Sequence, residues 1–283
     1  MAYLLMVGGV LVSLFEGIFI KKYNSRHSKG GFIFSGLVSL CSMLFFVISD
    51  SDGLNFSYQI IPYALAAGVM YCTASFLTYL AIGCGSFAIS MLILSYSIIF
   101  PIGYGLLFLN EPAGIYTYIG LLMLVVSLYL FRGEKDNEKS FSLKWVVCIL
   151  ISVIGSGMFS VISRIQQIRF DDLYTNEFMV IALGFSAFLL LVTGIIKDRK
   201  NLVYIIKNGS LYALGAGLSN GMTNFCILVV NTLIPISVAS PTQSGIKVVL
   251  SFLASIILFK EKFLKRQIVG VLLGFFAVIF LNI

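Results

Sequence analysis

A lysine stands in the middle of a long apolar segment, and its neighbours on the same helical face are polar. Lys247 lies within residues 236–259, and the next charged residue toward the C-terminus is Lys260. Gln243 precedes it by four residues and Ser240 by one more turn, so the three share one face of a helix. A charge at mid-membrane depth is costly and normally faces a protein interior or a water-filled cavity. The stripe therefore indicates a polar pathway inside a membrane protein.

The composition is that of an integral membrane protein. Of its 283 residues, 59% are hydrophobic and only 11% are charged, against roughly 25% charged in soluble domains. The net charge of +7 comes from basic residues in short loops beside apolar segments, so we expect no nucleic-acid partner. The five cysteines and the single histidine have no metal-site or disulfide spacing. No P-loop or nucleophile elbow occurs, so we expect neither an enzyme nor a bound cofactor.

Ten apolar segments approach the roughly 20 residues that a spanning helix needs. They are residues 2–20, 31–49, 59–80, 86–109, 113–131, 144–163, 177–196, 209–230, 236–259 and 266–283. The longest polar connector, residues 132–143, separates residues 1–131 from residues 144–283, with five segments on each side. We therefore predict an all-α polytopic protein with ten transmembrane helices in two five-helix halves.

The two halves resemble each other in sequence. At an offset of 149, the matching residues are Tyr63-Ala64-Leu65 with Tyr212-Ala213-Leu214, Ala67-Gly68 with Ala216-Gly217, and Phe76 with Phe225. At an offset of 150, Glu111 and Gly120 match Glu261 and Gly270. Because five is an odd number, equivalent helices cross the membrane in opposite senses. Such inverted repeats are typical of secondary transporters that hold their solute near the midplane.

These features resemble the drug/metabolite transporter superfamily, specifically its EamA-like ten-span members. The segments that carry the resemblance are Leu109–Pro112 followed by Gly120, and Phe259–Lys262 followed by Gly270. The first half is also similar to a small multidrug resistance subunit, with Gly8-Gly9 and then Glu16, although Glu16 lies further from the glycine pair than the glutamate of that family. The resemblance implies that the fifth and tenth spans are peripheral and that the other eight surround a central cavity.

Polar residues within the spans are the expected site. The predicted solute-binding residues are Lys247, Gln243, Ser240, Asn220, Asn224, Tyr96, Ser97 and Tyr71. Glu16 is the only acidic residue clearly inside a span, and we expect it to couple transport to a proton or another ion, or to be the counter-charge of Lys247. Structural roles stay open: Lys247 in an ion pair, the asparagines and tyrosines in helix packing, and Glu16 in an interfacial pair with Lys21 or Lys22.

The charge of the loops predicts an orientation. Sixteen of the 19 lysines and arginines fall in the odd-numbered loops, whereas the even-numbered loops hold only Arg164 and Arg169. Positively charged loops stay in the cytoplasm. We therefore expect the connector to be cytoplasmic and both termini to lie outside, in the cell membrane.

The resulting hypothesis is a secondary transporter, not driven by ATP, that works by alternating access. One cation and one anion in a neutral cavity suit a zwitterionic or carboxylate-bearing metabolite such as an amino acid. A scaffold or accessory subunit without transport, and an exporter of organic cations or drugs, are the alternatives. Gly270 and Gly274 form a small-residue face suited to helix packing, so we expect a monomer or a weak homodimer.

Overall fold

The described part of the chain is helical throughout. The computed structural model describes residues 2–27, 30–50, 53–109, 114–130, 142–199, 202–233, 236–260 and 265–280, and every regular element in these ranges is a helix. The elements are α1 (Ala2–His27), α2 (Gly31–Ser49), η1 (Tyr58–Ile60), α3 (Ile61–Cys84), α4 (Phe87–Ser95), η2 (Tyr96–Ile98), α5 (Ile99–Phe108), α6 (Ile115–Leu130), α7 (Leu143–Arg169), α8 (Thr175–Lys197), α9 (Leu202–Leu233), α10 (Ile236–Phe259) and α11 (Lys265–Phe280). The predicted all-α class is confirmed.

Several helices are long and apolar enough to cross a membrane. Within the described ranges there are seven such segments, the α4–η2–α5 segment counted as one of them. The apolar parts of α10 and α11 described here are shorter, at Gln243–Phe259 and Ile268–Ala277. The protein is therefore a multi-pass membrane protein. The glutamates of the two repeated motifs, Glu111 and Glu261, lie outside the described residues.

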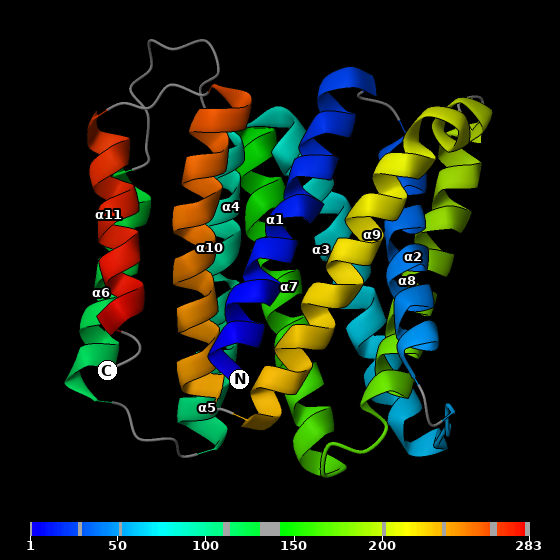
Figure 1. The fold of residues 1–283 in the computed structure, drawn as a ribbon, viewed down its shortest axis with the longest axis horizontal. Coiled ribbons are helices and arrows are strands. Elements are labelled where there is room, and N and C mark those ends of the chain that lie inside the picture. Colours follow the sequence, from blue (N-terminus) through cyan, green and yellow to red (C-terminus); the bar gives the residue numbers. More distant parts are fainter. Residues whose placement is uncertain are drawn as a thin grey trace.

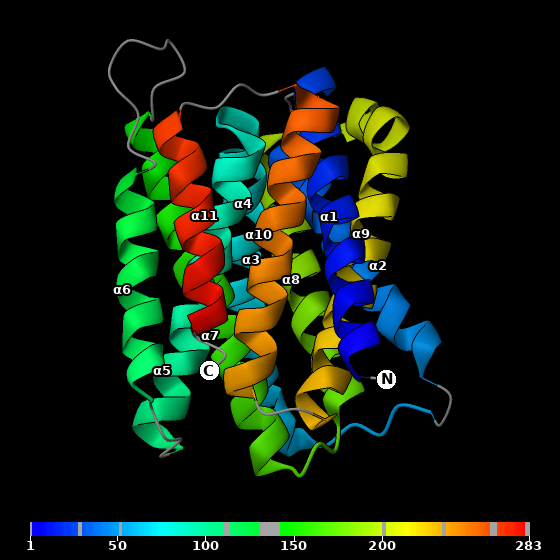
Figure 2. The ribbon, with the colours of Figure 1, turned by 60° about the vertical axis from the view of Figure 1, so that its left-hand side comes forward.

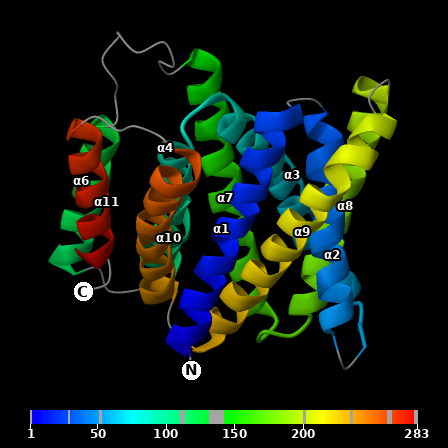
Figure 3. The same cartoon turned by 45° about the horizontal axis from the view of Figure 1, so that its top comes forward.

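The helices form one bundle with a peripheral pair (Figure 1). In all three views α6 and α11 lie side by side at one edge, and α10 contacts α11 (Figures 2 and 3). The start of α1 and the end of α11 lie at the same end of the bundle. The opposite end, where α1 finishes with Arg26 and His27, is called the basic end below.

Packing follows one pattern in both halves of the chain. In the first half, α1 and α2 both pack on α9, the third helix of the second half. In the second half, α7 and α8 both pack on α3, the third helix of the first half. α2 and α8 also pack on each other. α1 and α7, the first helices of the two halves, run in opposite directions (Figure 1).

Two glycines that match at the offset of 149 allow this close packing. A Cβ on Gly68 would lie 2.7 Å from the carbonyl oxygen of Ala182 in α8, and a Cβ on Gly217 would lie 2.7 Å from that of Val38 in α2. Because these obstacles are backbone atoms, neither position can take a side chain without moving the helices apart. Small residues let membrane helices approach closely.

The fourth apolar segment is not one continuous α-helix. A 3-10 turn, η2, separates α4 from α5, and Pro101 is the third residue of α5. Proline has no N–H, so it cannot donate to the carbonyl of Ser97, and the regular helix is interrupted there. In a membrane such irregular backbone is tolerated only inside protein or beside a wet cavity.

Three helices extend beyond their apolar segments, which corrects part of the sequence interpretation. Arg164 and Arg169, expected in a loop, belong to α7, and Lys207 belongs to α9. The apolar window ends at the first charged residues, but backbone hydrogen bonding continues through them. α1 likewise continues through Lys21 to His27.

An aromatic layer closes the bundle near the basic end. Tyr23 and Phe34 are fully buried and stack with ring centroids 4.2 Å apart. Phe87 of α4 contacts Phe259 of α10 at 5.1 Å. Lys21 ties α1 to the end of α3, because its Nζ donates to the carbonyl oxygens of Ile82 (3.0 Å) and Gly85 (2.7 Å).

Candidate functional site

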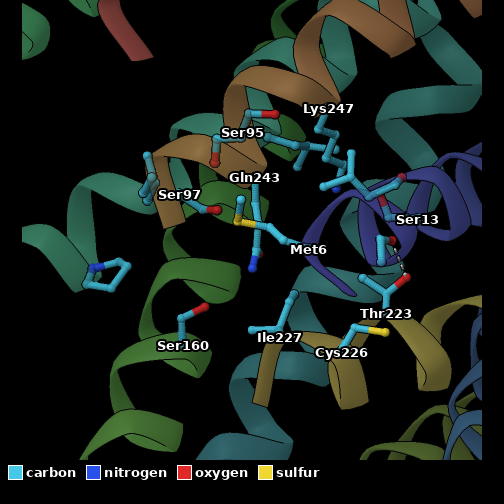
Figure 4. Close-up of a pocket in the computed structure, with 16 residues that line it drawn as sticks. Met6, Ser13, Ser95, Ser97, Ser160, Thr223, Cys226, Ile227, Gln243 and Lys247 are labelled. Carbon is cyan, nitrogen blue, oxygen red and sulfur yellow. Dashed lines mark hydrogen bonds between the residues drawn. The ribbon is translucent and has the colours of Figure 1, made fainter. Parts of the chain in front are cut away.

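A cavity of about 160 Å³ lies between helices of both halves (Figure 4). The residues that line it are Met6, Gly9, Val10 and Ser13 of α1, Leu94 and Ser95 of α4, Ser97 and Ile98 of η2, Pro101 of α5, Ser160 of α7, Thr223, Cys226 and Ile227 of α9, and Gln243, Ser244 and Lys247 of α10. The cavity is smaller than the roughly 300–1,000 Å³ of pockets for drug-sized ligands. It therefore suits a small solute.

Local sequence explains why α4–η2–α5 and α10 present polar groups to the cavity. The interrupted fourth segment presents Ser97 and Pro101 to the cavity, as expected for irregular backbone at membrane depth. On the facing side, Gln243 and Lys247 are four residues apart and project from one face of α10 (Figure 4). A broken helix of the first half and a polar stripe of the second thus both contribute polar groups to the lining.

The polar groups of the lining divide into two kinds. Ser13 and Ser95 donate to carbonyls of their own helices, at Val10 (2.7 Å) and Met91 (2.9 Å). Ser97, Gln243 and Lys247 have no hydrogen-bond partner among the residues that the structure describes. A solute entering the cavity would therefore meet a hydroxyl, an amide and an ammonium group that are available for hydrogen bonding.

Next to the cavity, a cluster of polar side chains is centred on Asn220, which is only 8% exposed. Its Oδ1 lies 2.9 Å from the Ser42 hydroxyl, 2.7 Å from the Tyr71 hydroxyl and 3.0 Å from Asn224 Nδ2. Its Nδ2 donates to Glu16 Oε1 at 3.0 Å. These five side chains, here named the Asn220 cluster, join α1, α2, α3 and α9.

Glu16 connects the Asn220 cluster to the cavity. It lies one turn beyond Ser13 on α1, and Lys247 attracts its carboxylate electrostatically. The hydrogen bond to Glu16 that the structure describes comes from Asn220 and not from a lysine at the membrane surface. Glu16 and Lys247 thus interact electrostatically on the side of the cavity nearer the basic end.

The predicted site residues separate into groups. Lys247, Gln243 and Ser97 line the cavity. Asn220, Asn224 and Tyr71 belong to the Asn220 cluster beside it. Tyr96 faces elsewhere, with its hydroxyl 2.9 Å from Ser127 Oγ of α6. Ser240 belongs to α10, but its side chain lies outside the described residues.

Other polar residues of the site are not among the predicted solute-binding residues. Ser42 completes the Asn220 cluster, while Ser13, Ser160 and Thr223 line the cavity. Isolated serines and threonines are common in membrane helices, so their type alone gave no signal. Helical spacing could have found Ser13 and Thr223, because each lies close along its helix to a residue that was selected, Glu16 or Asn220.

Comparison with known proteins gives the family and the fold. Residues 143–283 match the model of the EamA-like transporter family. One protein crystal structure superposes with a TM-score of 0.63 at 12% sequence identity, covering 100% of this chain and 98% of the other. At that identity the match concerns the fold alone. No curated protein matches the sequence significantly.

The Asn220 cluster predicts a difference between two asparagines of α9. Replacing Asn220 by alanine leaves Glu16 and the donors around it without their partner, so Asn220→Ala should lower stability by about 1–3 kcal/mol. The hydrogen bond that the structure describes for the Asn208 side chain goes to the carbonyl of Tyr204 on its own helix, so Asn208→Ala should change stability by less than about 0.5 kcal/mol. Thermal unfolding of both variants in detergent measures this difference, and equal melting temperatures would show that the cluster does not hold the helices together.

Proposed function

Because residues 143–283 belong to the EamA-like transporter family, we propose that the protein is a secondary transporter of a small, carboxylate-bearing or zwitterionic metabolite. The observation that carries this proposal is the ammonium group of Lys247, which lies in the cavity without a hydrogen-bond partner among the described residues. A cation at this depth favours an anionic group as its ligand. It disfavours organic cations as the main solute.

The chemistry of the cavity supports an amino acid or a similar metabolite. A carboxylate can accept a charge-assisted hydrogen bond from Lys247 and further bonds from Ser97 and Gln243. The carboxylate of Glu16, beyond Ser13, offers a counterpart to an ammonium group on the same solute. A volume of about 160 Å³ limits the solute to a small molecule.

We propose that the protein has ten spans in two inverted repeats, residues 1–131 and 144–283, joined by residues 132–143. The shared packing pattern and the opposite directions of α1 and α7 support this arrangement. Tyr71 and Asn220 are hydrogen-bonded and are 149 residues apart, the offset at which the halves match in sequence. Equivalent residues of two repeats meet only close to the axis that relates the repeats. In such transporters the solute is held at the repeat interface and the repeats move against each other.

We propose that the structure corresponds to a state in which the basic end is closed. The aromatic layer and the Lys21 contacts lie between the cavity and that end. If the basic end is cytoplasmic, as the loop charges predict, opening toward the cytoplasm requires the Tyr23–Phe34 stack and the Phe87–Phe259 contact to separate. Alternating access would then move α1 against α2, and α4 against α10.

Lys247→Met is expected to fold and to lose transport. Removing a cation from the middle of the membrane relieves a cost of roughly 2.5–3.5 kcal/mol on insertion scales. This gain offsets the attraction that Glu16 loses, and Glu16 keeps its hydrogen bond from Asn220. The melting temperature should therefore change little, whereas uptake into liposomes should collapse. Lys207→Met, at an exposed position of α9, is the control and should leave uptake unchanged. The solute is first identified by a thermal-shift screen of amino acids and small carboxylates, because a ligand of the native state raises apparent stability. A stable Lys247→Met protein that transports at the wild-type rate would remove Lys247 from the site.

Glu16 is proposed to couple solute movement to a proton. The titratable groups that face it are Lys247 from α10 and Tyr71 from α3. A solute carboxylate that binds Lys247 weakens the attraction between Lys247 and the Glu16 carboxylate. Solute binding and proton binding at Glu16 are therefore linked.

We expect an inward proton gradient to accelerate uptake by the wild-type protein and not by Glu16→Gln. Glu177→Gln is the control, because Glu177 is also buried but accepts a hydrogen bond from the backbone of Asn55 near the end of the bundle opposite the basic one. That variant should keep the response to the gradient. Liposome uptake with and without the gradient provides the measurement, and the same response in Glu16→Gln and wild type would assign Glu16 a structural role.

The orientation predicts that both termini lie outside the cell. The start of α1 and the end of α11 lie at the same end of the bundle, away from the basic end (Figure 1). A reporter that is active only in the cytoplasm should therefore be silent when fused to the C-terminus and active when inserted in the connector. Activity at the C-terminus would reverse the orientation without changing the fold.

A further inference from the structure

Four polar side chains of α7 and α9 contain buried atoms without a hydrogen-bond partner in the described structure. They are Arg164 (Nε), Gln166 (Oε1), Gln167 (Oε1 and Nε2) and Asn231 (Oδ1). Gln167 is only 2% exposed, and a buried polar group left unsatisfied costs about 1–3 kcal/mol. Buried polar groups normally have partners, so this arrangement calls for a ligand or for water.

Helical spacing places Arg164, Gln167 and Asn231 beyond lining residues of the cavity, toward the end of the bundle opposite the basic end. Ser160, Arg164 and Gln167 are spaced i, i+4 and i+7 on α7, so they share one face, and Ser160 lines the cavity. On α9, Asn231 lies one turn beyond Ile227, which also lines it. α7 and α9 run in the same direction (Figure 1), so both polar stripes extend from the cavity the same way.

Neighbouring polar residues of α7 show what a structural role looks like here. Gln166 Nε2 donates to the carbonyl of Leu173 in the turn before α8, at 2.8 Å, so this side chain is tied to a loop although its Oε1 has no partner. Arg169 donates to the Tyr63 hydroxyl and lies over its ring. Arg164 and Gln167 have no such side-chain contacts among the described residues, and the guanidinium of Arg164 is on a half-buried side chain.

We propose that Arg164, Gln167 and Asn231 form an outer subsite that binds the carboxylate-bearing solute on its way to or from Lys247. A guanidinium group binds a carboxylate with two parallel hydrogen bonds, and the Gln167 amide can donate a third. The oxygens of Gln167 and Asn231 accept hydrogen bonds from an ammonium or hydroxyl group of the same molecule. This proposal depends on the proposed function in one respect, namely that the solute carries a carboxylate.

Chemical labelling tests the subsite without measuring transport. Phenylglyoxal modifies accessible arginines, and mass spectrometry of the purified protein in detergent reports modification of Arg164 and Arg169 separately. We expect L-alanine, pyruvate and acetate to slow modification of Arg164, acetamide to have no effect, and Arg169 to react equally in every case. The same protection should persist in Lys247→Met, because the subsite does not include Lys247.

The possible outcomes separate this proposal from the proposed function. Protection of Arg164 in Lys247→Met supports the subsite even if that variant transports normally. Absence of protection by every carboxylate, equal protection of both arginines, or protection that disappears in Lys247→Met would overturn it.

Transport provides a second readout. Arg164→Gln should raise the KM for the solute by about tenfold, because the variant loses a hydrogen bond to a charged group. The maximal rate should stay close to that of the wild type. Arg169→Gln, the control at the same helix end, should leave KM unchanged. An unchanged KM in Arg164→Gln would contradict the subsite.

Discussion

Placing charge inside an apolar helical bundle is the constraint on which the rest of this structure depends. Glu16 lies in a helix long and apolar enough to cross a membrane, and Lys247 lies in the shorter apolar stretch Gln243–Phe259. A charged side chain in such surroundings needs a partner or water. Glu16 has both an electrostatic counterpart in Lys247 and a hydrogen bond from Asn220. Asn220 is in turn held by Ser42, Tyr71 and Asn224. Four helices are thereby fixed around one carboxylate, and the ammonium group opposite is left with hydrogen-bonding capacity for a solute.

The two halves contribute different chemistry at matching places. Tyr71 and Asn220 correspond at the offset of 149, yet one supplies a hydroxyl donor and the other an amide that both accepts and donates. At the offset of 150, Ser97 corresponds to Lys247, and both line the cavity. The matched backbones permit the close packing seen at Gly68 and Gly217. Because their side chains differ, the two halves place a positive charge on one side of the cavity and not on the matching side.

The helical class, the polar helical face that carries Lys247 and Gln243, and the resemblance to the EamA-like family were predictable from the sequence, because each depends on local periodicity or a nearby motif. The ends of the helices were less predictable. The apolar segment stops before Arg164, whereas α7 continues through Arg164 to Arg169. The assignment of Asn220 to the Asn220 cluster and of Tyr96 to a contact with Ser127 depends on packing between distant segments. A polar residue in a membrane helix needs a partner, but its sequence position does not say whether that partner is another helix or a solute.

The central claim is that a solute occupies the cavity beside Lys247, and Cys226, which lines the same cavity, can report on it. The most direct measurement is the rate at which a small methanethiosulfonate reagent modifies Cys226 in a protein whose other four cysteines are replaced by serine. A solute found by the thermal-shift screen should slow this reaction, and the effect should disappear when Lys247 is replaced by methionine. A reaction rate that the solute does not change, or that it slows equally in both proteins, would contradict the account.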